Sequence, residues 1–354
     1  MQRIVPQVQH YDWGSETAIP ALLGVEPDGQ PWAELWIGDH PRLPSVVAST
    51  GEPLDADLPF LMKVLAAAEP LSIQTHPSLD RAIAGFEAEN QAGVPIDAPH
   101  RTYRDANHKP ELICALTPFD ALVGFRNPVD VVAEFDSIAA MDPIVERLSG
   151  PDPDRLQLTV EWLLRLPADE VAALVADVAP AVELAALLNS FYPGDRGVLV
   201  GLLLNRITLA PGDAVFLGAG NLHAYLSGVG VEIMANSDNV IRGGLTPKHI
   251  DVEELLSVVS FDAFEPDIQR ASGAEHRFRS AGSGFQLTRL ESPDGAVIDV
   301  TGPELVFVTS GAIQVRCSDG SHTFLGPGEA ACVDAGPNYT LRGTGVAWRA
   351  SAEG

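Results

Sequence analysis

Alternation of hydrophobic and polar positions divides the chain into strand-like and helix-like stretches. Residues 1–125, 206–255 and 256–354 carry short apolar or alternating runs separated by Gly and Pro, which are typical of antiparallel strands. Residues 126–205 instead carry apolar residues at i, i+3 and i+4 with many Ala and Leu, the spacing of amphipathic helices. The pattern therefore predicts a mainly β protein with an α-helical insert: a helical domain (126–205) interrupts the first β domain (1–125 and 206–255), and a second β domain (256–354) follows.

One predicted hairpin places a histidine at a defined position in the first β domain. Pro211-Gly212-Asp213 is a turn signal, residues 214–217 form a short apolar strand, and residues 218–221 form a second turn before His223. A Pro-Gly-acidic turn followed by a strand, a glycine and a histidine is how a cupin-type jelly roll closes its metal site. We therefore expect the imidazole of His223 to be available as a metal ligand.

A second copy of this pattern lies near the C-terminus. Pro327-Gly328-Glu329 matches the first turn, Gly336 matches Gly220 at the same offset, and Tyr339 stands where His223 stands. Two copies of one hairpin predict two related, cupin-like antiparallel β jelly-roll domains. Because the second copy lacks the histidine, we expect only the first domain to keep a metal ligand.

Other elements are predicted before the helical domain. The run WAELWIGDHP (32–41) alternates as a strand that places Glu34 and Trp36 on one face, which is either the lining of a polar pocket or a surface strand with partly buried tryptophans. Residues 60–67 are a buried strand or the start of a helix. Ser78 is a suitable N-cap for a helix that runs to about Asn90.

Four separated side chains are candidate metal ligands. Gln74 and His76 stand two residues apart in a predicted strand, so they point to the same face. Glu111 heads an apolar strand, where a carboxylate is either solvated or a ligand. With His223 they would give two imidazoles, a carboxylate and an amide oxygen, a set that suits zinc, with manganese and iron(II) as rivals.

A glycine-rich turn between two basic residues predicts an anion site. Arg242 and Lys248 flank Gly243-Gly244, and Thr246 and Pro247 suit the N-cap and first position of a short helix. Charge, backbone N–H groups and the helix dipole together favour a phosphate group. The alternative is a pair of exposed basic residues.

Charge and cysteine content exclude several classes of protein. A net charge of −26 argues against binding to nucleic acid or to an anionic membrane. No apolar run reaches the roughly 20 residues of a membrane helix, and the first residues lack a signal-peptide layout, so we expect a cytoplasmic protein that acts on a small molecule as a monomer. Cys114, Cys317 and Cys332 are far apart and odd in number, which predicts core residues and not disulfides or a zinc–thiolate site.

Several segments resemble, in order and spacing, the signatures of one enzyme family. AELWIGDHP (33–41), SIQTHP (72–77), YRDANHKPE (103–111) and the segment 221–251 resemble those of the type I phosphomannose isomerases, also called mannose-6-phosphate isomerases. VQHYDWGS (8–15) is similar to the opening of that family. The resemblance covers residues 8 to 251, and the helical and C-terminal regions agree with the family in kind.

The resemblance implies a zinc enzyme that interconverts mannose 6-phosphate and fructose 6-phosphate, with two cupin-like β domains and a helical domain. It implies one zinc ion per chain, held by Gln74, His76, Glu111 and His223. It further implies a pocket with the catalytic candidates Lys109, Asp238 and Arg242 and the substrate-binding candidates Trp36, Ser72, Tyr225, Glu232 and Lys248. Asp39 stands where the family more often has Thr, which leaves the metal ligands unaffected.

These residue types suit the chemistry of aldose–ketose isomerisation. The reaction removes a proton next to a carbonyl and develops negative charge on the oxygens of a cis-enediol. Zinc with a single carboxylate ligand keeps a formal charge of about +1, which polarises the carbonyl, and Arg242 or Lys109 would add electrostatic stabilisation. Lys109 or Asp238 is our hypothesis for proton transfer, with Glu232 and His40 as alternatives.

Two other functions fit parts of the pattern. A cupin-type iron(II) oxygenase would use His76, Glu111 and His223 as a facial triad. The basic residues Lys109, Arg242 and Lys248 argue against it, because an uncharged substrate does not require them. A non-catalytic sugar-binding bicupin is the third possibility.

Overall fold

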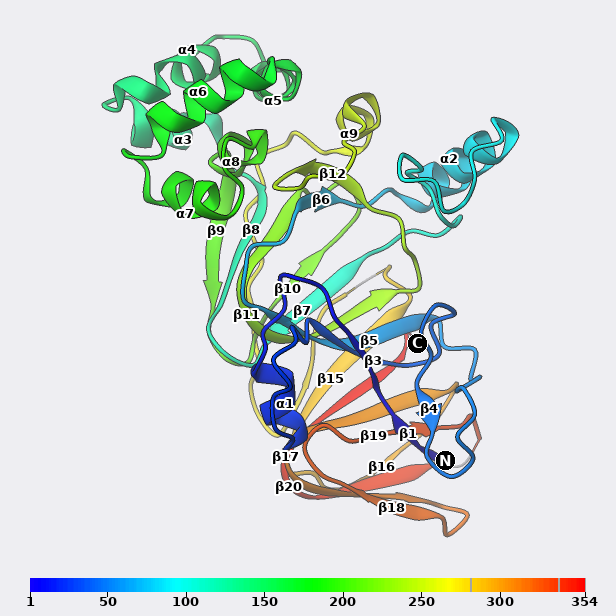
Figure 1. The fold of residues 1–354 in the computed structure, drawn as a ribbon. Helices are drawn as coiled ribbons and strands as arrows, with labels where there is room; N and C mark the ends of the chain where they lie inside the picture. The colour runs from blue at the N-terminus through cyan, green and yellow to red at the C-terminus, as the bar shows by residue number, and fades with distance from the viewer. Residues whose placement is uncertain (281, 337, 354) are drawn as a thin grey trace.

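Two antiparallel sheets organise the protein, and most of its helices gather at one end (Figure 1). The structure is a computed structural model that describes residues 1–280, 282–336 and 338–353. Over this range one sheet has eleven strands and the other nine. The mainly β fold with an inserted set of helices is confirmed.

The larger sheet is built from residues on both sides of the helical segment. Its strands lie in the order β13-β10-β7-β11-β5-β3-β2, and the others pair off this path. They are β2 (Gln7–Gln9), β3 (Glu34–Ile37), β5 (Phe60–Ala67), β6 (Ile73–Thr75), β7 (Glu111–Ala115), β8 (Phe119–Phe125), β9 (Leu204–Leu209), β10 (Asp213–Leu217), β11 (His223–Ala235), β12 (Ile241–Gly244) and β13 (Gln269–Arg270).

Strand β11 links two groups of strands in this sheet. Its first residues pair with β6 and β8, whereas its residues from Gly228 onward pair with β5 and β7. Gly228 has φ of +122°, and a Cβ there would lie 2.7 Å from the carbonyl oxygen of Pro118, so a larger residue does not fit. His223 opens this strand, as the hairpin pattern predicts, and Glu232 lies near its other end.

The helical segment packs against the back of this sheet. Its core side chains, among them Val171, Leu188 and Leu199, form one cluster with Ile73 of β6 and Leu122 of β8. The helices therefore help to hold β6 in place. They are α3 (Pro128–Phe135), a 3₁₀ turn (Ala139–Met141), α4 (Asp142–Leu148), α5 (Arg155–Arg165), α6 (Ala168–Val178), α7 (Glu183–Phe191) and α8 (Arg196–Gly201).

The second sheet combines the C-terminal region with two strands from the start of the chain. Its order is β14-β15-β20-β17-β19-β1-β4, with β16 on β20 and β18 on β17. Ile4 of β1 lies opposite Ala330 of β19. The strands are β1 (Gln2–Val5), β4 (Val46–Val47), β14 (Glu275–Arg277), β15 (Phe285–Glu291), β16 (Asp294–Ile298), β17 (Glu304–Cys317), β18 (His322–Leu325), β19 (Ala330–Val333) and β20 (Tyr339–Ala352). The boundaries of the three domains remain a prediction.

Apolar side chains of the two sheets share one core. The cluster contains Phe60, Met62 and Leu112 from the larger sheet and Phe307 and Trp348 from the smaller one. Burial of such large side chains stabilises each by roughly 1.5–3 kcal/mol relative to exposure. The C-terminal sheet therefore covers an apolar face of the sheet that carries the candidate site.

The repeated hairpin of the C-terminal region keeps its shape without a histidine. Strand β19 follows the Pro-Gly turn and Tyr339 opens β20, as His223 opens β11. The Tyr339 hydroxyl donates to Glu304 at 2.8 Å, and the guanidinium of Arg349 pairs with the same carboxylate. A neutral hydroxyl and an ion pair thus occupy the interior of this region.

Two helices beside the larger sheet show whether the predicted N-cap residues are correct. Helix α2 (Leu79–Gln91) begins after Ser78, whose hydroxyl accepts the Arg81 N–H, and this prediction is confirmed. Helix α9 (Val252–Val258) does not begin at Thr246, and that prediction is wrong. The Thr246 hydroxyl accepts the Lys248 N–H and closes a turn, whereas Asp251 caps α9 by accepting the Glu254 N–H.

A short helix, α1 (Ala18–Leu23), completes the fold. Within the described parts of the chain, none of the helices has both the length and the apolar character to span a bilayer.

Candidate metal centre and anion site

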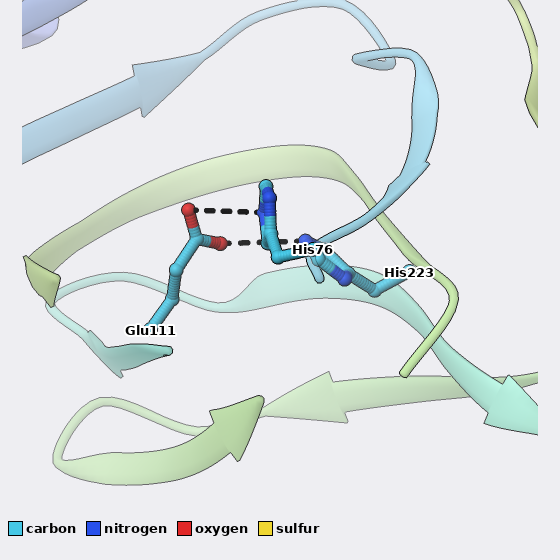
Figure 2. Close-up of side chains that lie close together, drawn as sticks. All are labelled: His76, Glu111 and His223. Atoms are coloured by element: carbon cyan, nitrogen blue, oxygen red, sulfur yellow. Dashed lines mark ion pairs between the residues drawn. The ribbon is translucent and has the colours of Figure 1, made fainter. Parts of the chain in front are cut away.

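Three buried side chains converge from three strands of the larger sheet. His76 follows β6, Glu111 opens β7 and His223 opens β11, and one ligand atom of each lies within 4.8 Å of the others. Figure 2 shows the Glu111 carboxylate facing both rings, with His76 Nε2 3.3 Å from Oε1 and His223 Nε2 3.3 Å from Oε2. The sequence predicted all three as ligands.

Backbone carbonyls determine which nitrogen of each ring faces Glu111. Nδ1 of His76 donates to the carbonyl of Asn239 at 2.7 Å, and Nδ1 of His223 donates to the carbonyl of Asn221 at 3.0 Å. A carbonyl only accepts, so Nδ1 carries the proton and Nε2 presents a lone pair. Metal-binding histidines are commonly oriented by such bonds.

The cluster fits a bound cation. Nε2 of both histidines and Oε2 of Glu111 are buried without a hydrogen-bond partner. Burial lowers the pKa of His76 to about 4, so its ring stays neutral. Burial alone would raise the pKa of Glu111, but Lys109 and His76 outweigh it and hold that pKa well below its ordinary value. Lone pairs and a carboxylate that face one another in a dry site are the donor set of zinc.

Strand pairing brings the fourth predicted ligand to this site. Gln74, in the middle of β6, lies opposite His223 on one side and opposite Arg242 on the other. Residues paired across antiparallel strands present their side chains on one face. Gln74 and Arg242 therefore flank the metal cluster, and Ser72 immediately precedes the same strand. Ligation by Gln74 remains a prediction.

Two loops are bonded together next to His76. The Asp105 carboxylate accepts the Ser237 hydroxyl at 2.8 Å and the Asp238 N–H at 2.7 Å. The Asn239 amide donates to the carbonyls of Asp105 and Asn107, both at 2.9 Å. These bonds hold the Asn239 carbonyl against His76 and place Asp238 at the edge of the site.

Lys109 forms an ion pair with the carboxylate of the cluster. Its Nζ lies 3.0 Å from Glu111 Oε1, and the whole residue is only 8% exposed. An ammonium and a carboxylate at this distance attract each other strongly in a buried site. Lys109 therefore contributes positive charge beside the metal ligands.

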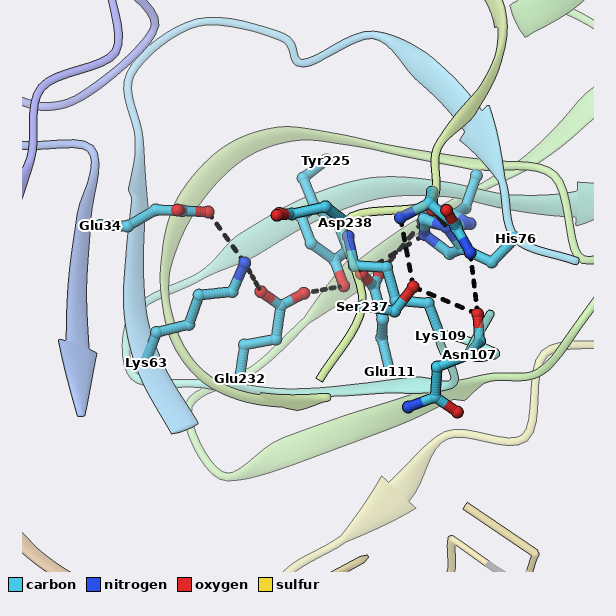
Figure 3. Close-up of polar contacts among 12 residues, drawn as sticks. Glu34, Lys63, His76, Asn107, Lys109, Glu111, Tyr225, Glu232, Ser237 and Asp238 are labelled. Atoms are coloured by element: carbon cyan, nitrogen blue, oxygen red, sulfur yellow. Dashed lines mark hydrogen bonds and ion pairs between the residues drawn. The ribbon is translucent and has the colours of Figure 1, made fainter. Parts of the chain in front are cut away.

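A chain of buried polar side chains runs from the cluster across the sheet (Figure 3). The Tyr225 hydroxyl donates to Glu232 at 2.9 Å, and Lys63 bridges Glu232 at 2.7 Å and Glu34 at 2.9 Å. The Trp36 indole donates to Glu34 at 2.8 Å. Burial would lower the pKa of Lys63, but the charges of Glu232 and Glu34 outweigh burial and raise that pKa above its ordinary value. The pKa of Glu232 is raised by burial, although Lys63 acts to lower it. Predicted site residues Trp36, Tyr225 and Glu232 thus belong to one network.

Positive charge gathers on the other side of the cluster. Nε of Arg242 is buried without a partner, and burial together with Arg104 lowers the pKa of this guanidinium. The pKa of Lys248 is lowered by partial burial and, to a smaller extent, by the positive charges of Arg242, Arg104 and Arg42. The one counter-ion to Arg42 among the described residues is Asp238, at 3.5 Å. Cations that destabilise one another favour a bound anion.

Sequence patterns missed three charged residues of this region, Lys63, Arg42 and Arg104. Lys63 is the one charge in the otherwise apolar run FLMKVLAA, and every residue of β5 is buried, so a lone lysine in a central strand was a usable signal. Glu34 was predicted on an alternating face that could line a polar pocket. Arg42 and Arg104 lie in irregular polar segments, where nothing in the local pattern marks them.

Comparison with known proteins agrees with this geometry. Residues 1–55 and 48–128 match the profile of the type I phosphomannose isomerase catalytic domain. Mannose-6-phosphate isomerase of Escherichia coli (strain K12) is 38% identical over 391 residues, with 98% of each chain covered. A crystal structure of mannose 6-phosphate isomerase bound with zinc and yttrium superposes with a TM-score of 0.90 at 37% identity, covering 100% of this chain and 99% of the other.

The apo form of mannose 6-phosphate isomerase from Salmonella typhimurium superposes equally well. Its TM-score is 0.91 at 37% identity, with 100% of this chain and 99% of the other covered. Sequence identity and fold thus agree over nearly the whole length of both chains. The protein belongs to the type I phosphomannose isomerase family.

Proposed function

We propose that the protein is a zinc-dependent isomerase that interconverts mannose 6-phosphate and fructose 6-phosphate through a cis-enediol. The observation that carries this proposal is the buried cluster of His76, Glu111 and His223 beside unneutralised basic residues. A sugar phosphate needs both parts, because its carbonyl must be polarised and its phosphate must be bound. The similarity to named mannose-6-phosphate isomerases supports the choice of sugar.

We assign the zinc ion to Gln74, His76, Glu111 and His223. When bound, it would supply Lewis acidity that polarises the substrate carbonyl and stabilises charge on oxygen. Lys109 keeps Glu111 ionised and adds positive potential on the same side. The carbonyls of Asn239 and Asn221 keep both rings oriented between substrate-binding events.

Arg242 and Lys248 are assigned different roles by their positions. Arg242 lies beside Gln74 on the metal-ligand face and has an unpartnered Nε, so we assign it to the negative charge that develops on the substrate oxygens. Lys248 is exposed, and we assign it to the phosphate group. Trp36, Ser72, Tyr225 and Glu232 are assigned to the wall of the sugar site.

Asp238 is the strongest of the four proposed proton-transfer groups. Lys109 Nζ is engaged in its ion pair with Glu111, and both oxygens of Glu232 face donors, Tyr225 and Lys63. Burial lowers the pKa of His40, and its Nδ1 already accepts the Arg42 N–H. Asp238 is half-buried and is held at the site through its own N–H, and the ion pair with Arg42 involves only Oδ1, at 3.5 Å, so Oδ2 is able to accept a proton.

Replacing Asp238 tests this assignment. We expect Asp238→Asn to lower kcat by about 100-fold or more with zinc content unchanged, because general base catalysis contributes that much. The matched control is Asp262→Asn, a surface carboxylate near α9, which should leave kcat unchanged. A decrease of less than about tenfold in Asp238→Asn would exclude Asp238 as the base and return the role to Lys109, Glu232 or His40.

A coupled assay tests the function itself. Formation of fructose 6-phosphate from mannose 6-phosphate should be measured before chelation, after chelation and after zinc is restored. We expect activity to be lost with the metal and to return with zinc. Oxygen uptake with iron(II) and no isomerisation would support an oxygenase, and sugar binding without turnover in every metal form would support a binding protein.

Some expectations go beyond the site. A role in GDP-mannose biosynthesis, a cytoplasmic location and a monomeric state remain predictions that follow from the proposed activity and from the composition. So does the expectation that nucleic acid is not a partner, which rests on the net charge of −26.

A further inference from the structure

Two arginines lie together on one exposed face of the C-terminal sheet. Arg316 of β17 is paired with Thr340 of β20, and Gln314 with Arg342, so the two arginines are diagonal neighbours on one face. Both are exposed. Neither forms an ion pair within the described residues, unlike Arg349 of the same sheet, which pairs with Glu304. We call the surface formed by Arg316, Arg342 and their paired residues Thr340 and Gln314 the arginine face.

The nearby carboxylates are engaged elsewhere. Asp294 lies opposite Arg342 in the pairing of β16 with β20, but its carboxylate accepts the Ala296 N–H. Asp299 accepts the side chain of Asn338, and Asp319 accepts the N–H and the hydroxyl of Ser321. Two adjacent like charges destabilise a sheet when nothing lies between them. The arginine face therefore has positive charge available for a ligand.

A hollow above the two arginines has the size of a small molecule. Its volume is about 360 Å³. Gln314, Thr340 and Val297 line it together with Arg316 and Arg342. Small-molecule sites usually occupy roughly 300–1,000 Å³.

Gly295 leaves room beside Arg342, because a Cβ at this position would lie 2.0 Å from Nε of that guanidinium. The Arg342 side chain therefore packs against the backbone of β16.

Apolar side chains border the charged centre. Phe324 of β18 is paired with Gln314, and Val297 of β16 is paired with Thr340, so both project on the arginine face. They are 62% and 66% exposed. A ligand with a phosphate group at the arginines and a less polar part against Phe324 would cover both kinds of surface.

We propose that the arginine face is a binding site for a small phosphate-bearing metabolite. Paired guanidinium groups bind phosphate oxygens through charge-assisted hydrogen bonds, and arginine is the side chain best suited to this geometry. The chain carries 48 acidic and 22 basic residues, so its overall field repels a long polyanion but leaves a small dianion free to bind locally. The site lies at the opposite end of the molecule from β6 and β12, and it is separate from the proposed sugar site (Figure 1).

A local reporter distinguishes this site from the cations around Arg242. Phe324→Trp places an indole on the arginine face, and its emission should change when inorganic pyrophosphate is added at low ionic strength. Arg316→Ala with Arg342→Ala should weaken this response by at least ~30-fold, because two charge-assisted contacts are lost. Arg242→Ala should leave the response unchanged. Arg277→Ala, which removes an exposed arginine paired with Glu275, is the matched control and should also have no effect.

Separate titrations with inorganic phosphate, mannose 6-phosphate and adenosine diphosphate identify the source of the phosphate group. The probe that binds most tightly identifies the class of ligand. Thermal unfolding of each variant verifies that the fold is retained. An unchanged emission with all probes, or a response that survives loss of both arginines, would overturn the proposal. Neither outcome depends on whether the protein isomerises a sugar.

Discussion

Glu111→Gln should abolish tight zinc binding and reduce isomerase turnover by about a thousandfold or more. The carboxylate is the one anionic side chain in the cluster with the two imidazoles, so its loss removes the charge that attracts the cation. Loss of several kcal/mol of Lewis-acid stabilisation corresponds to at least this decrease in rate, since about 1.4 kcal/mol is tenfold. Zinc content after dialysis and kcat in the coupled assay measure the two effects.

The matched control for Glu111→Gln is Glu134→Gln. Glu134 pairs with Arg126 at the helical end, and its side chain is 54% exposed, so the same chemical change should alter neither zinc content nor turnover. A Glu111→Gln protein that retains one zinc per chain and ordinary turnover would show that Glu111 is not a ligand. The proposed metal centre would then be wrong.

Lys63→Met should destabilise the protein by about 3–5 kcal/mol, because it leaves two buried carboxylates without their shared cation. Lys63 bridges Glu232 and Glu34, and its side chain is 8% exposed. Burial without a counter-ion raises the pKa of a carboxyl group above its value in the unfolded chain. The folded variant is therefore penalised least below the unfolded pKa, where the carboxyls are neutral, and it loses stability as pH rises through the raised pKa. The variant should therefore become more stable toward pH 5, measured as the free energy of unfolding in urea.

A double variant separates the ion pair from the loss of volume. Lys63→Met with Glu232→Gln removes one of the two stranded charges, so part of the lost stability should return. Turnover should fall in the double variant, because Glu232→Gln changes the group that accepts the Tyr225 hydroxyl at the proposed sugar site. A single variant that unfolds at the same urea concentration as the unaltered protein would mean that the buried network does not stabilise the fold.

Sequence patterns predicted the metal cluster because each ligand stands at a strand boundary. His223 follows a turn signal at the start of β11, Glu111 starts β7, and His76 ends the run that contains β6. Local alternation identifies such boundaries, and the resemblance to a family connected them across more than a hundred residues. The hairpin repeat with Tyr339 was visible for the same reason.

Features that depend on pairing between distant strands could not be predicted from the sequence. The contact of Lys63 with Glu34 and Glu232 needs three strands in a particular register, and no local pattern encodes that order. The start of α9 was misplaced because Thr246 and Asp251 are both good caps, and the choice between them depends on a turn closed by the Thr246 hydroxyl.

The pairing of β1 with β19 has a consequence for how the chain is made. Ile4 precedes its partner Ala330 by 326 positions, so it leaves the ribosome long before Ala330 is synthesised. Until then the N-terminal strand has an unpaired edge, which in nascent chains is a site for chaperones or for wrong pairing. The smaller sheet therefore cannot be completed before β19 has been synthesised, however early the larger one has formed.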